Sequence, residues 1–436
     1  MSALFLFITV FSCLLLGFPV SFTLGGVSMI YGISAFGLDL FNLMPLRIWG
    51  SITNFVLVAV PLFVYMGVML EKSGIAEEML ETMALLFGKI RGGMAISVIV
   101  VGAMLAAATG IVGATVVTMG LLSLPTMVKR GYNIPLSCGT ICAAGTLGQI
   151  IPPSIALVLI ASVFNISIGD IYLGSFIPGF ILVGLYLLYI IIIAIFKGDQ
   201  VSAMPDEDLA QFRKENMVRR IILAFLLPMS LIVAVLGSIF AGIASPTESA
   251  AVGALGASIL ALAKGQLTYK KAMAVMYDTT NLTAMVFILL IGAAAFGLVF
   301  RGLGGDSYII EFIERINMSP MMFLLLVNTI IFIAGFFIDY IEITFIILPI
   351  VGPIFQHMGL DLLWVGVLIG LNFQTSFLTP PFGFSLFYLQ SVAPKGVTIG
   401  HIYRGVVPFI IIQIIGLLIV IFYPDTVFLL PKLLAK

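Results

Sequence analysis

The segment GTLGQIIPPS, residues 145–154, places two consecutive prolines inside a long apolar run, and a similar segment, TSFLTPPFG, returns at residues 375–383. Proline has no backbone N–H, and its ring clashes with the preceding helical turn. Each pair therefore interrupts a helix. One pair alone would indicate an ordinary kink, but two pairs at related positions favour two broken helices, residues 136–166 and 363–390, that bind a ligand.

Other prolines repeat at nearly the same spacing. Pro125 recurs as Pro353, 228 positions later, as do both members of the first pair. Pro19 and Pro178 recur after 227 and 230 positions. Transport proteins often contain such weak internal symmetry. We therefore predict two related units, with a polar linker between them; the divisions are residues 1–197, 198–219 and 220–436.

The composition indicates a membrane protein. Hydrophobic residues make up 61% of the chain and charged residues 9%, and the mean hydropathy is +1.23, whereas soluble domains are about 25% charged. At least ten apolar stretches approach the roughly 20 residues that a spanning helix needs. Continuous apolar runs such as 181–196 exclude a β-barrel, whose strands alternate. The fold class is therefore an all-α polytopic membrane protein, and we interpret the apolar N-terminal segment as a retained span.

Each unit contains an apolar stretch too long for one span, at residues 94–128 and 320–356, preceded by a shorter amphipathic segment at 75–91 and 307–317. We interpret the long stretches as re-entrant helical hairpins and the amphipathic segments as helices on the membrane surface. With the N-terminus outside, fifteen of the 20 basic residues fall on the inner side, as the positive-inside rule favours. Each unit then crosses the membrane five times, so the second repeat is inverted relative to the first.

The first hairpin has a glycine-rich tip. Gly110 and Gly113 permit a tight reversal, and Thr109 and Thr115 lie beside them. Half-helices that end at such a tip direct their positive N-terminal ends at anions and their carbonyl ends at cations.

The second tip carries two carboxylates, Asp339 and Glu342, among apolar residues. A charged carboxylate near mid-membrane costs about 2.5–3.5 kcal/mol on insertion scales, so a partner or a function is expected. Asp339 is expected to pair with a cation or to brace the tip, with proton coupling as the rival interpretation, and Glu342 can instead reach water. Glu248 fits a first-turn helix residue better than a ligand.

The proline breaks point to a hard cation. The carbonyls of Gly148, Gln149, Ser376 and Phe377 lose their usual helical donors, because prolines follow four residues later. Hydroxyl groups lie close by on Thr146, Ser154, Ser376 and Thr379. Oxygen ligands of this kind suit sodium.

Several function classes fit poorly. The formal net charge is zero, which gives no basic surface for nucleic acid. The three cysteines lie in apolar runs and indicate neither a disulfide nor a metal site. The two histidines, His357 and His401, are far apart, so no HExxH protease motif exists, and we expect no enzyme activity and no cofactor beyond a coupling ion. A channel remains an alternative, because hairpins and carbonyls also build filters.

Taken in order, five segments resemble the large membrane subunit of tripartite ATP-independent periplasmic (TRAP) transporters, in the wider ion transporter superfamily. The resemblance covers essentially the whole chain. The segments are PLFVYMGVMLEKSGIA (61–76), GATVVTMGLLSLPTM (113–127), CGTICAAGTLGQIIPPSI (138–155), SPTESAAVGA (245–254) and GFFIDYIEITFIILPIVGPI (335–354).

This resemblance implies sodium-coupled import of a small organic anion, a carboxylate, across the inner (cytoplasmic) membrane of a bacterium or archaeon. It also implies two protein partners, a periplasmic substrate-binding protein and a small four-helix membrane subunit, and an elevator-type movement of the hairpins and broken helices. A stand-alone sodium/carboxylate symporter of the same superfamily is the alternative.

The resemblance also assigns site residues. The two sodium sites would be formed by Thr109, Gly110, Gly148, Ile151 and Pro153, and by Gly335, Asp339, Thr379 and Pro381. Substrate would contact Thr115, Thr146, Thr344 or Ser376.

Overall fold

A computed structural model describes residues 2–203 and 221–434, with the side chains of Leu15, Phe41 and residues 106–109 excepted. Every regular element in these residues is a helix. The first half contains α1 (Ser2–Leu15), α2 (Val20–Phe36), η1 (Gly37–Asp39), α3 (Leu40–Ile52), η2 (Phe55–Val58), α4 (Ala59–Lys72), α5 (Ile75–Leu86), α6 (Gly93–Thr109), α7 (Val112–Lys129), α8 (Ile134–Thr146), η3 (Leu147–Gln149), α9 (Ile155–Phe164), α10 (Ile168–Phe196) and η4 (Gly198–Gln200).

The second half begins with a short π-helix, η5 (Ile222–Leu226). It is followed by α13 (Leu227–Phe240), α14 (Pro246–Ala263), α15 (Tyr269–Gly302), α16 (Gly305–Arg315), α17 (Pro320–Ala334), α18 (Tyr340–Ile346), α19 (Leu348–His357), α20 (Leu362–Leu378), α21 (Phe384–Val392), α22 (Ile399–Phe422) and α23 (Asp425–Leu434). Most of the expected linker, from residue 204 onward, lies outside the described residues.

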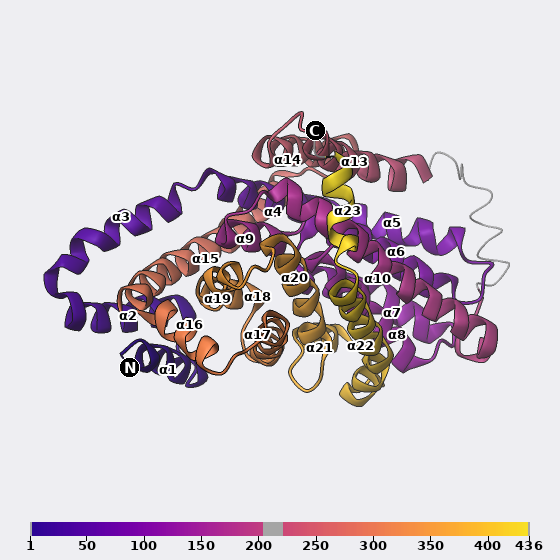
Figure 1. The fold of residues 1–436 in the computed structure, drawn as a ribbon. Coiled ribbons are helices and arrows are strands. Elements are labelled where there is room, and N and C mark those ends of the chain that lie inside the picture. Colours follow the sequence, from indigo (N-terminus) through magenta and orange to yellow (C-terminus); the bar gives the residue numbers. More distant parts are fainter. Residues whose placement is uncertain (1, 204–220, 435–436) are drawn as a thin grey trace.

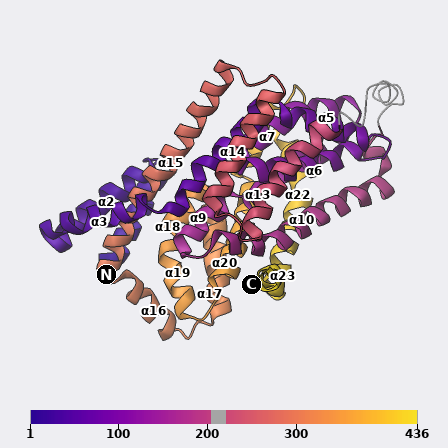
Figure 2. The same ribbon diagram turned by 90° about the horizontal axis from the view of Figure 1, so that it is seen from above.

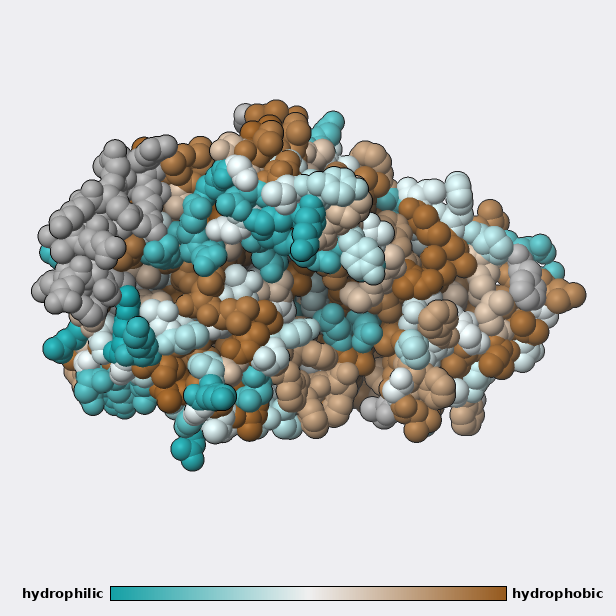
Figure 3. All heavy atoms as spheres, turned by 180° about the vertical axis from the view of Figure 1, so that it is seen from behind, coloured by the Kyte–Doolittle hydropathy of each residue, from teal (hydrophilic) through white to brown (hydrophobic). Residues whose placement is uncertain are grey.

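The helices form an elongated body from which α2 and α3 project; these two helices are called the wing below. Helices α2 and α3 extend from one end, at the left of Figures 1 and 2, and the long helix α15 packs against both of them. Helices α6, α7, α8, α10 and α22 gather at the opposite end, and α17–α19 lie between (Figure 1). Apolar side chains cover much of the outer surface (Figure 3), as expected where lipid is the solvent.

Eight described helices are long and apolar enough to span a membrane, or nine if the bent pair α18–α19 counts as one. The ten or more apolar stretches of the sequence therefore do not all form helices of full spanning length in the described residues. Tips and proline breaks leave α6, α9, α17 and α20 as apolar helices shorter than 18 residues.

Helices α8 and α9 flank the first proline pair, and α20 and α21 flank the second, so each predicted broken helix is interrupted near its prolines. The re-entrant course of the two hairpins stays a prediction. Helices α6 and α7 contact each other and join through Gly110 and Ile111. The return arm of the second hairpin, however, is itself bent by 54° between α18 and α19. Pro349 explains this bend, because it has no N–H to donate to the carbonyl four residues earlier.

The first amphipathic segment does not lie freely on a surface. Helix α5 ends at Leu86, and it buries Ile75, Met79 and Met83 against the body, where α6 is its neighbour. We expect one apolar face of this segment to comprise Ile75, Met79, Met83, Leu86 and Ile90, and the structure confirms this face as far as Met83. Ile90 lies beyond the helix and is half exposed, so it does not continue the face.

The two halves of the chain meet where α8 crosses α22. A Cβ atom on Gly139 would overlap the carbonyl of Gly405, and one on Gly405 would overlap the carbonyl of Pro135. Backbones approach this closely only where side chains are absent.

We therefore expect Gly405→Ala to lower the thermal stability of the purified protein markedly, because overpacking costs about 1–3 kcal/mol or more. Gly237→Ala is the matched control, since a Cβ there has no neighbour within 4 Å. Melting followed by tryptophan fluorescence in detergent tests the pair; equal melting temperatures would contradict the tight crossing.

Candidate functional site

The first hairpin tip presses on the first broken helix. Gly110 has a φ of +61°, which favours glycine, and a Cβ there would lie 3.0 Å from Cγ1 of Ile155 and 3.1 Å from its backbone nitrogen. Ile155 begins α9, directly after the proline break. The structure thus places Gly110 beside the segment that contains the buried residues Ile151 and Pro153. Gly148 is also buried, in η3.

Thr109 is the last residue of α6, and its side chain lies outside what the structure describes. Its expected role as a ligand therefore stays a prediction.

The second tip presses on the second broken helix in the same manner. A Cβ on Gly335 would lie 2.6 Å from Cβ of Ser376 in α20 and would also meet its hydroxyl oxygen. The rings of Phe337 and Phe382, 5.6 Å apart, join this tip to the residue that follows Pro381. Thr379 ends α20 in an extended conformation at the same break.

Asp339 has a clear structural role at this tip. It is the N-cap of α18, where its Oδ1 accepts a hydrogen bond from the N–H of Tyr340 at 2.6 Å. Glu342 Oε2 in turn accepts from the N–H of Asp339 at 3.2 Å, which completes a capping box. The structure therefore shows the bracing role of Asp339 and accounts for Glu342 through the same box, whereas cation pairing by Asp339 stays a prediction. The spacing D-x-x-E was the sequence signal for it.

Glu248 forms the corresponding box at the start of α14. Its carboxylate accepts from the N–H of Ser245 at 2.7 Å and from the hydroxyl of Ser245 at 2.8 Å. This confirms Glu248 as a first-turn residue.

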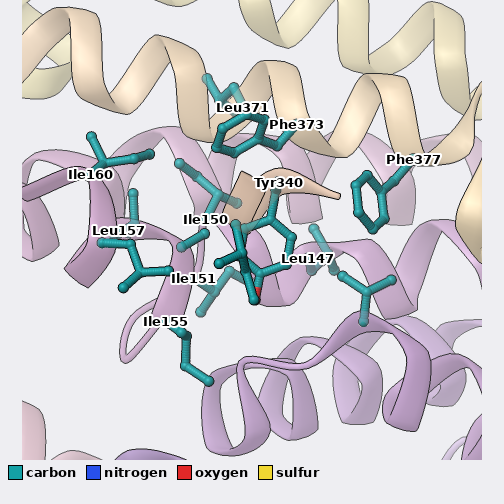
Figure 4. Close-up of a cluster of buried hydrophobic side chains, with 14 of the residues drawn as sticks. Leu147, Ile150, Ile151, Ile155, Leu157, Ile160, Tyr340, Leu371, Phe373 and Phe377 are labelled. Atoms are coloured by element: carbon teal, nitrogen blue, oxygen red, sulfur yellow. The ribbon is translucent and has the colours of Figure 1, made fainter. Parts of the chain in front are cut away.

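Tyr340 connects the two halves of the site. Its ring lies 6.0 Å from that of Phe373 and 5.9 Å from that of Phe377, both on α20. Figure 4 shows the same ring beside Ile150 and Ile151 of the first break. One apolar cluster therefore contains residues from both proline breaks.

The four predicted substrate residues have buried hydroxyl groups that all donate to their own helix. Thr115 donates to the carbonyl of Ile111 at 3.0 Å, and Thr344 donates to that of Tyr340 at 2.7 Å. Thr146 and Ser376 donate at 2.9 Å to carbonyls three residues earlier. A hydroxyl whose proton is engaged in this way offers lone pairs, which suit a cation or an N–H donor rather than a carboxylate.

The carbonyls beside the prolines are not left without donors. The hydroxyl of Ser154 donates to the carbonyl of Gln149 at 2.9 Å, and that of Ser385 donates to the carbonyl of Phe377 at 2.7 Å. The N–H of Thr379 donates to the carbonyl of Ser376 at 3.3 Å. The prediction of unpaired carbonyls is therefore wrong at these three positions, because hydroxyls and a turn replace the missing amides. Each carbonyl still has a second lone pair for a cation.

Sequence reasoning missed two buried amide side chains at this site. Gln149 and Gln374 are fully buried, and within the described part of the chain neither amide nitrogen nor amide oxygen has a hydrogen-bond partner. Buried polar groups are normally paired, so each exception calls for an explanation. Gln149 precedes the first proline pair, and Gln374 lies in the last turns of α20. A glutamine inside an apolar run was the available signal.

The two glutamines belong to neighbouring elements. A Cβ on Gly370, four residues before Gln374, would lie 3.7 Å from the backbone oxygen of Gln149. Gln149 and Gln374 therefore lie on two elements, η3 and α20, that pack against each other. Among the residues that the structure describes, no three His, Cys, Asp or Glu side chains form a metal cluster.

Comparison with known proteins identifies the family. A family model described as the tripartite ATP-independent periplasmic transporter, DctM component, matches residues 7–426. A C4-dicarboxylate TRAP transporter large permease protein of Pseudomonas aeruginosa is 31% identical over 93% of both chains. An ectoine/5-hydroxyectoine TRAP large permease protein of Ruegeria pomeroyi is 30% identical over 96% of each. In fold, the chain is similar to the Alcanivorax borkumensis YdaH transporter, with a TM-score of 0.64 at 14% identity, covering 90% of both chains.

Proposed function

The chain belongs to the DctM family of TRAP transporter large permeases, and from that premise we propose that it imports a small organic anion, a carboxylate, together with sodium. It is a multi-pass membrane permease, and its relatives are permeases rather than enzymes. The observation that carries the proposal is the repeated contact of a glycine hairpin tip with a proline-broken helix, Gly110 on Ile155 and Gly335 on Ser376.

The geometry supports different binding groups for the cation and for the anion. Helix-engaged hydroxyls and carbonyls present lone pairs, which a hard cation requires. We assign one sodium site to Thr109, Gly110, Gly148, Ile151 and Pro153, and the other to Gly335, Asp339, Thr379 and Pro381. In this proposal the amide groups of Gln149 and Gln374 donate hydrogen bonds to the carboxylate. Thr115, Thr146, Thr344 and Ser376 contact the substrate without donating to it.

The order of elements supports two inverted repeats and an elevator movement. In each half, a short helix (α5 or α16) precedes a helical hairpin, a proline-broken helix and a long helix (α10 or α22). In the proposed mechanism, the re-entrant hairpins and broken helices carry the bound ions and anion across as one unit. The wing and the helices around α15 stay in place.

The proposal includes location and partners. The permease resides in the inner membrane with its N-terminus on the periplasmic side. A small four-helix membrane subunit supports it there, and a periplasmic binding protein delivers the substrate.

Proteoliposomes that contain both membrane subunits test the proposal. With the loaded binding protein outside, we expect uptake of labelled carboxylate to follow an inward sodium gradient and to stop when potassium replaces sodium. Uptake that ignores the sodium gradient would refute sodium coupling. Uptake without any binding protein would instead favour a stand-alone symporter.

The two buried glutamines separate binding from stability. We expect Gln149→Leu and Gln374→Leu each to raise the KM for uptake about ten-fold or more, because a lost hydrogen bond to a charged group costs about 1.5–3 kcal/mol. Their melting temperatures should stay equal or rise, since leucine removes an unpaired buried amide.

Asn372→Leu is the matched comparison on the same helix. Asn372 Nδ2 already donates to the carbonyl of Asn328 at 2.7 Å, so this variant should lose stability. If the glutamine variants melt lower and keep their KM, the amides are structural and the assignment is wrong.

A further inference from the structure

A polar cavity lies beside the second hairpin, and its lining contains none of the residues assigned above to sodium or substrate. Its volume is about 480 Å³, within the usual range for small-molecule sites. Its walls come from α3 and α15 on one side, and from the end of α9 and the α18–α19 arm on the other. It therefore borders both the wing and the second hairpin.

Two arginines line this cavity. Arg47 comes from α3 and Arg301 from the last turn of α15, and both side chains are exposed. Arg301 Nε donates to the carbonyl of Gly297 at 3.1 Å. Although Arg47 is exposed as a whole, partial desolvation of its guanidinium group by neighbouring protein atoms lowers its pKa. The positive charge of Arg301 lowers this pKa further, so the two like charges lie close enough to interact.

Neither arginine forms an ion pair with a carboxylate of the described residues. Within the described ranges, no carboxylate oxygen lies within 4.0 Å of either guanidinium group. Asp306, at the start of α16, interacts electrostatically with Arg301 without forming such a pair. Two like charges at one cavity, without paired carboxylates, favour the entry of an anion.

The remaining polar lining suits a small solute better than a lipid chain. Ser51, Asn54, Ser162 and Gln356 all face the cavity. Asn54 Nδ2 donates to the hydroxyl of Ser162 at 3.2 Å, which joins the wing side to α9. An acyl chain would leave the two guanidinium groups without an anionic partner, whereas a carboxylate can accept hydrogen bonds from them.

The cavity is also close to the second tip. Phe345 lines it, and Phe345 lies on α18, the helix that Asp339 caps. Phe345 lies six positions after Asp339, roughly 9 Å along the helix axis. An anion held here would therefore be within reach of the proposed second sodium site.

We propose that this cavity is a separate anion site, in which Arg47 and Arg301 bind a small carboxylate before it reaches the site between the hairpin tips. The role in transit rests on the proposed function. The binding itself does not, because guanidinium groups form strong, often bidentate hydrogen bonds with carboxylates in any context.

Thiol chemistry tests the site without knowledge of the transported substrate. Ser51→Cys places a thiol on the cavity wall. The variant permease is purified with its small membrane subunit. The parent protein, prepared in the same way, gives the background labelling of the three native cysteines. The labelling rates of an anionic sulfonatoethyl and a cationic trimethylammonioethyl methanethiosulfonate are compared by mass spectrometry. Succinate is the carboxylate probe, with sodium chloride at equal ionic strength as the reference.

We expect Ser51→Cys to favour the anionic reagent, with a rate ratio that falls at least five-fold in the Arg47→Gln/Arg301→Gln background. The control Arg315→Gln, which removes a surface charge outside the cavity, should leave the ratio within two-fold. Succinate should slow labelling beyond the chloride reference, and only when both arginines are present.

The proposal is overturned if the double variant keeps the ratio or if succinate gives no more protection than chloride. Sodium-driven uptake by the unmodified transporter is measured separately. If uptake fails while the arginine-dependent protection holds, the transport proposal is wrong and the anion site stands. If uptake is sodium-driven and the arginine-dependent protection is missing, the transport proposal stands and the anion site is wrong.

Discussion

Asp339→Ala is expected to reduce the sodium affinity of transport roughly 10- to 100-fold. A carboxylate at a tip among apolar residues is costly, at about 2.5–3.5 kcal/mol on insertion scales, and a bound cation would offset that cost. Removal of the carboxylate removes both the proposed cation ligand and the cap of α18. The sodium concentration that gives half-maximal uptake in proteoliposomes is the measurement.

Two further variants separate these roles. Asp339→Asn keeps an amide oxygen that can still accept from the N–H of Tyr340, so the cap survives while the charge is lost. Glu342→Gln likewise keeps an acceptor for the N–H of Asp339. We expect Asp339→Asn to resemble the alanine variant in sodium affinity, and Glu342→Gln to have a mild effect. If Asp339→Asn behaves as the parent protein does, Asp339 is only a cap.

Gly335→Ala is expected to decrease the maximal uptake rate ten-fold or more. Its added Cβ would meet both side-chain atoms of Ser376, which lie on a short, fully buried side chain that has little room to move. The tip could then no longer close on α20 where the proline break begins. Initial uptake rates at saturating substrate and sodium provide the measurement.

The matched control is Gly184→Ala in α10, where a Cβ has no neighbour within 4 Å. A double variant, Gly335→Ala/Ser376→Gly, moves the side chain across the contact and should recover part of the hairpin closure. Closure can be followed by protection of the tip from proteolysis, independently of substrate binding. If Gly335→Ala transports normally, the contact is not needed for transport.

Much of the fold was predictable because its signals are local. Proline pairs interrupt a helix wherever they occur, so the breaks near residues 150–154 and 379–383 follow from chemistry within a few residues. The bend before Pro349 arises by the same rule, but the hairpin interpretation of residues 320–356 did not use it. The D-x-x-E spacing that starts at Asp339 was a similar local signal for the capping box.

The candidate site was less predictable because its contacts join distant segments. The sequence indicated that Gly335 and Ser376 are both important, but their direct contact depends on how α17 packs on α20. The donor roles of the hydroxyls also depended on backbone geometry. Ser154 and Ser385 restore bonds to carbonyls that proline chemistry alone would leave unpaired.

The sequence by itself determined that the protein lies in a membrane, where its helices are interrupted, and which family it resembles. Hydrophobicity, proline geometry and motif order carry these conclusions, and all three are properties of short segments. Only the tertiary structure decided which polar groups lack partners. Among the described residues, the amides of Gln149 and Gln374 lack partners because of the helices packed around them. Arg47 and Arg301, 254 positions apart, share one cavity because α15 packs against the wing. Burial and charge compensation depend on all neighbours in space, and no local pattern contains that information.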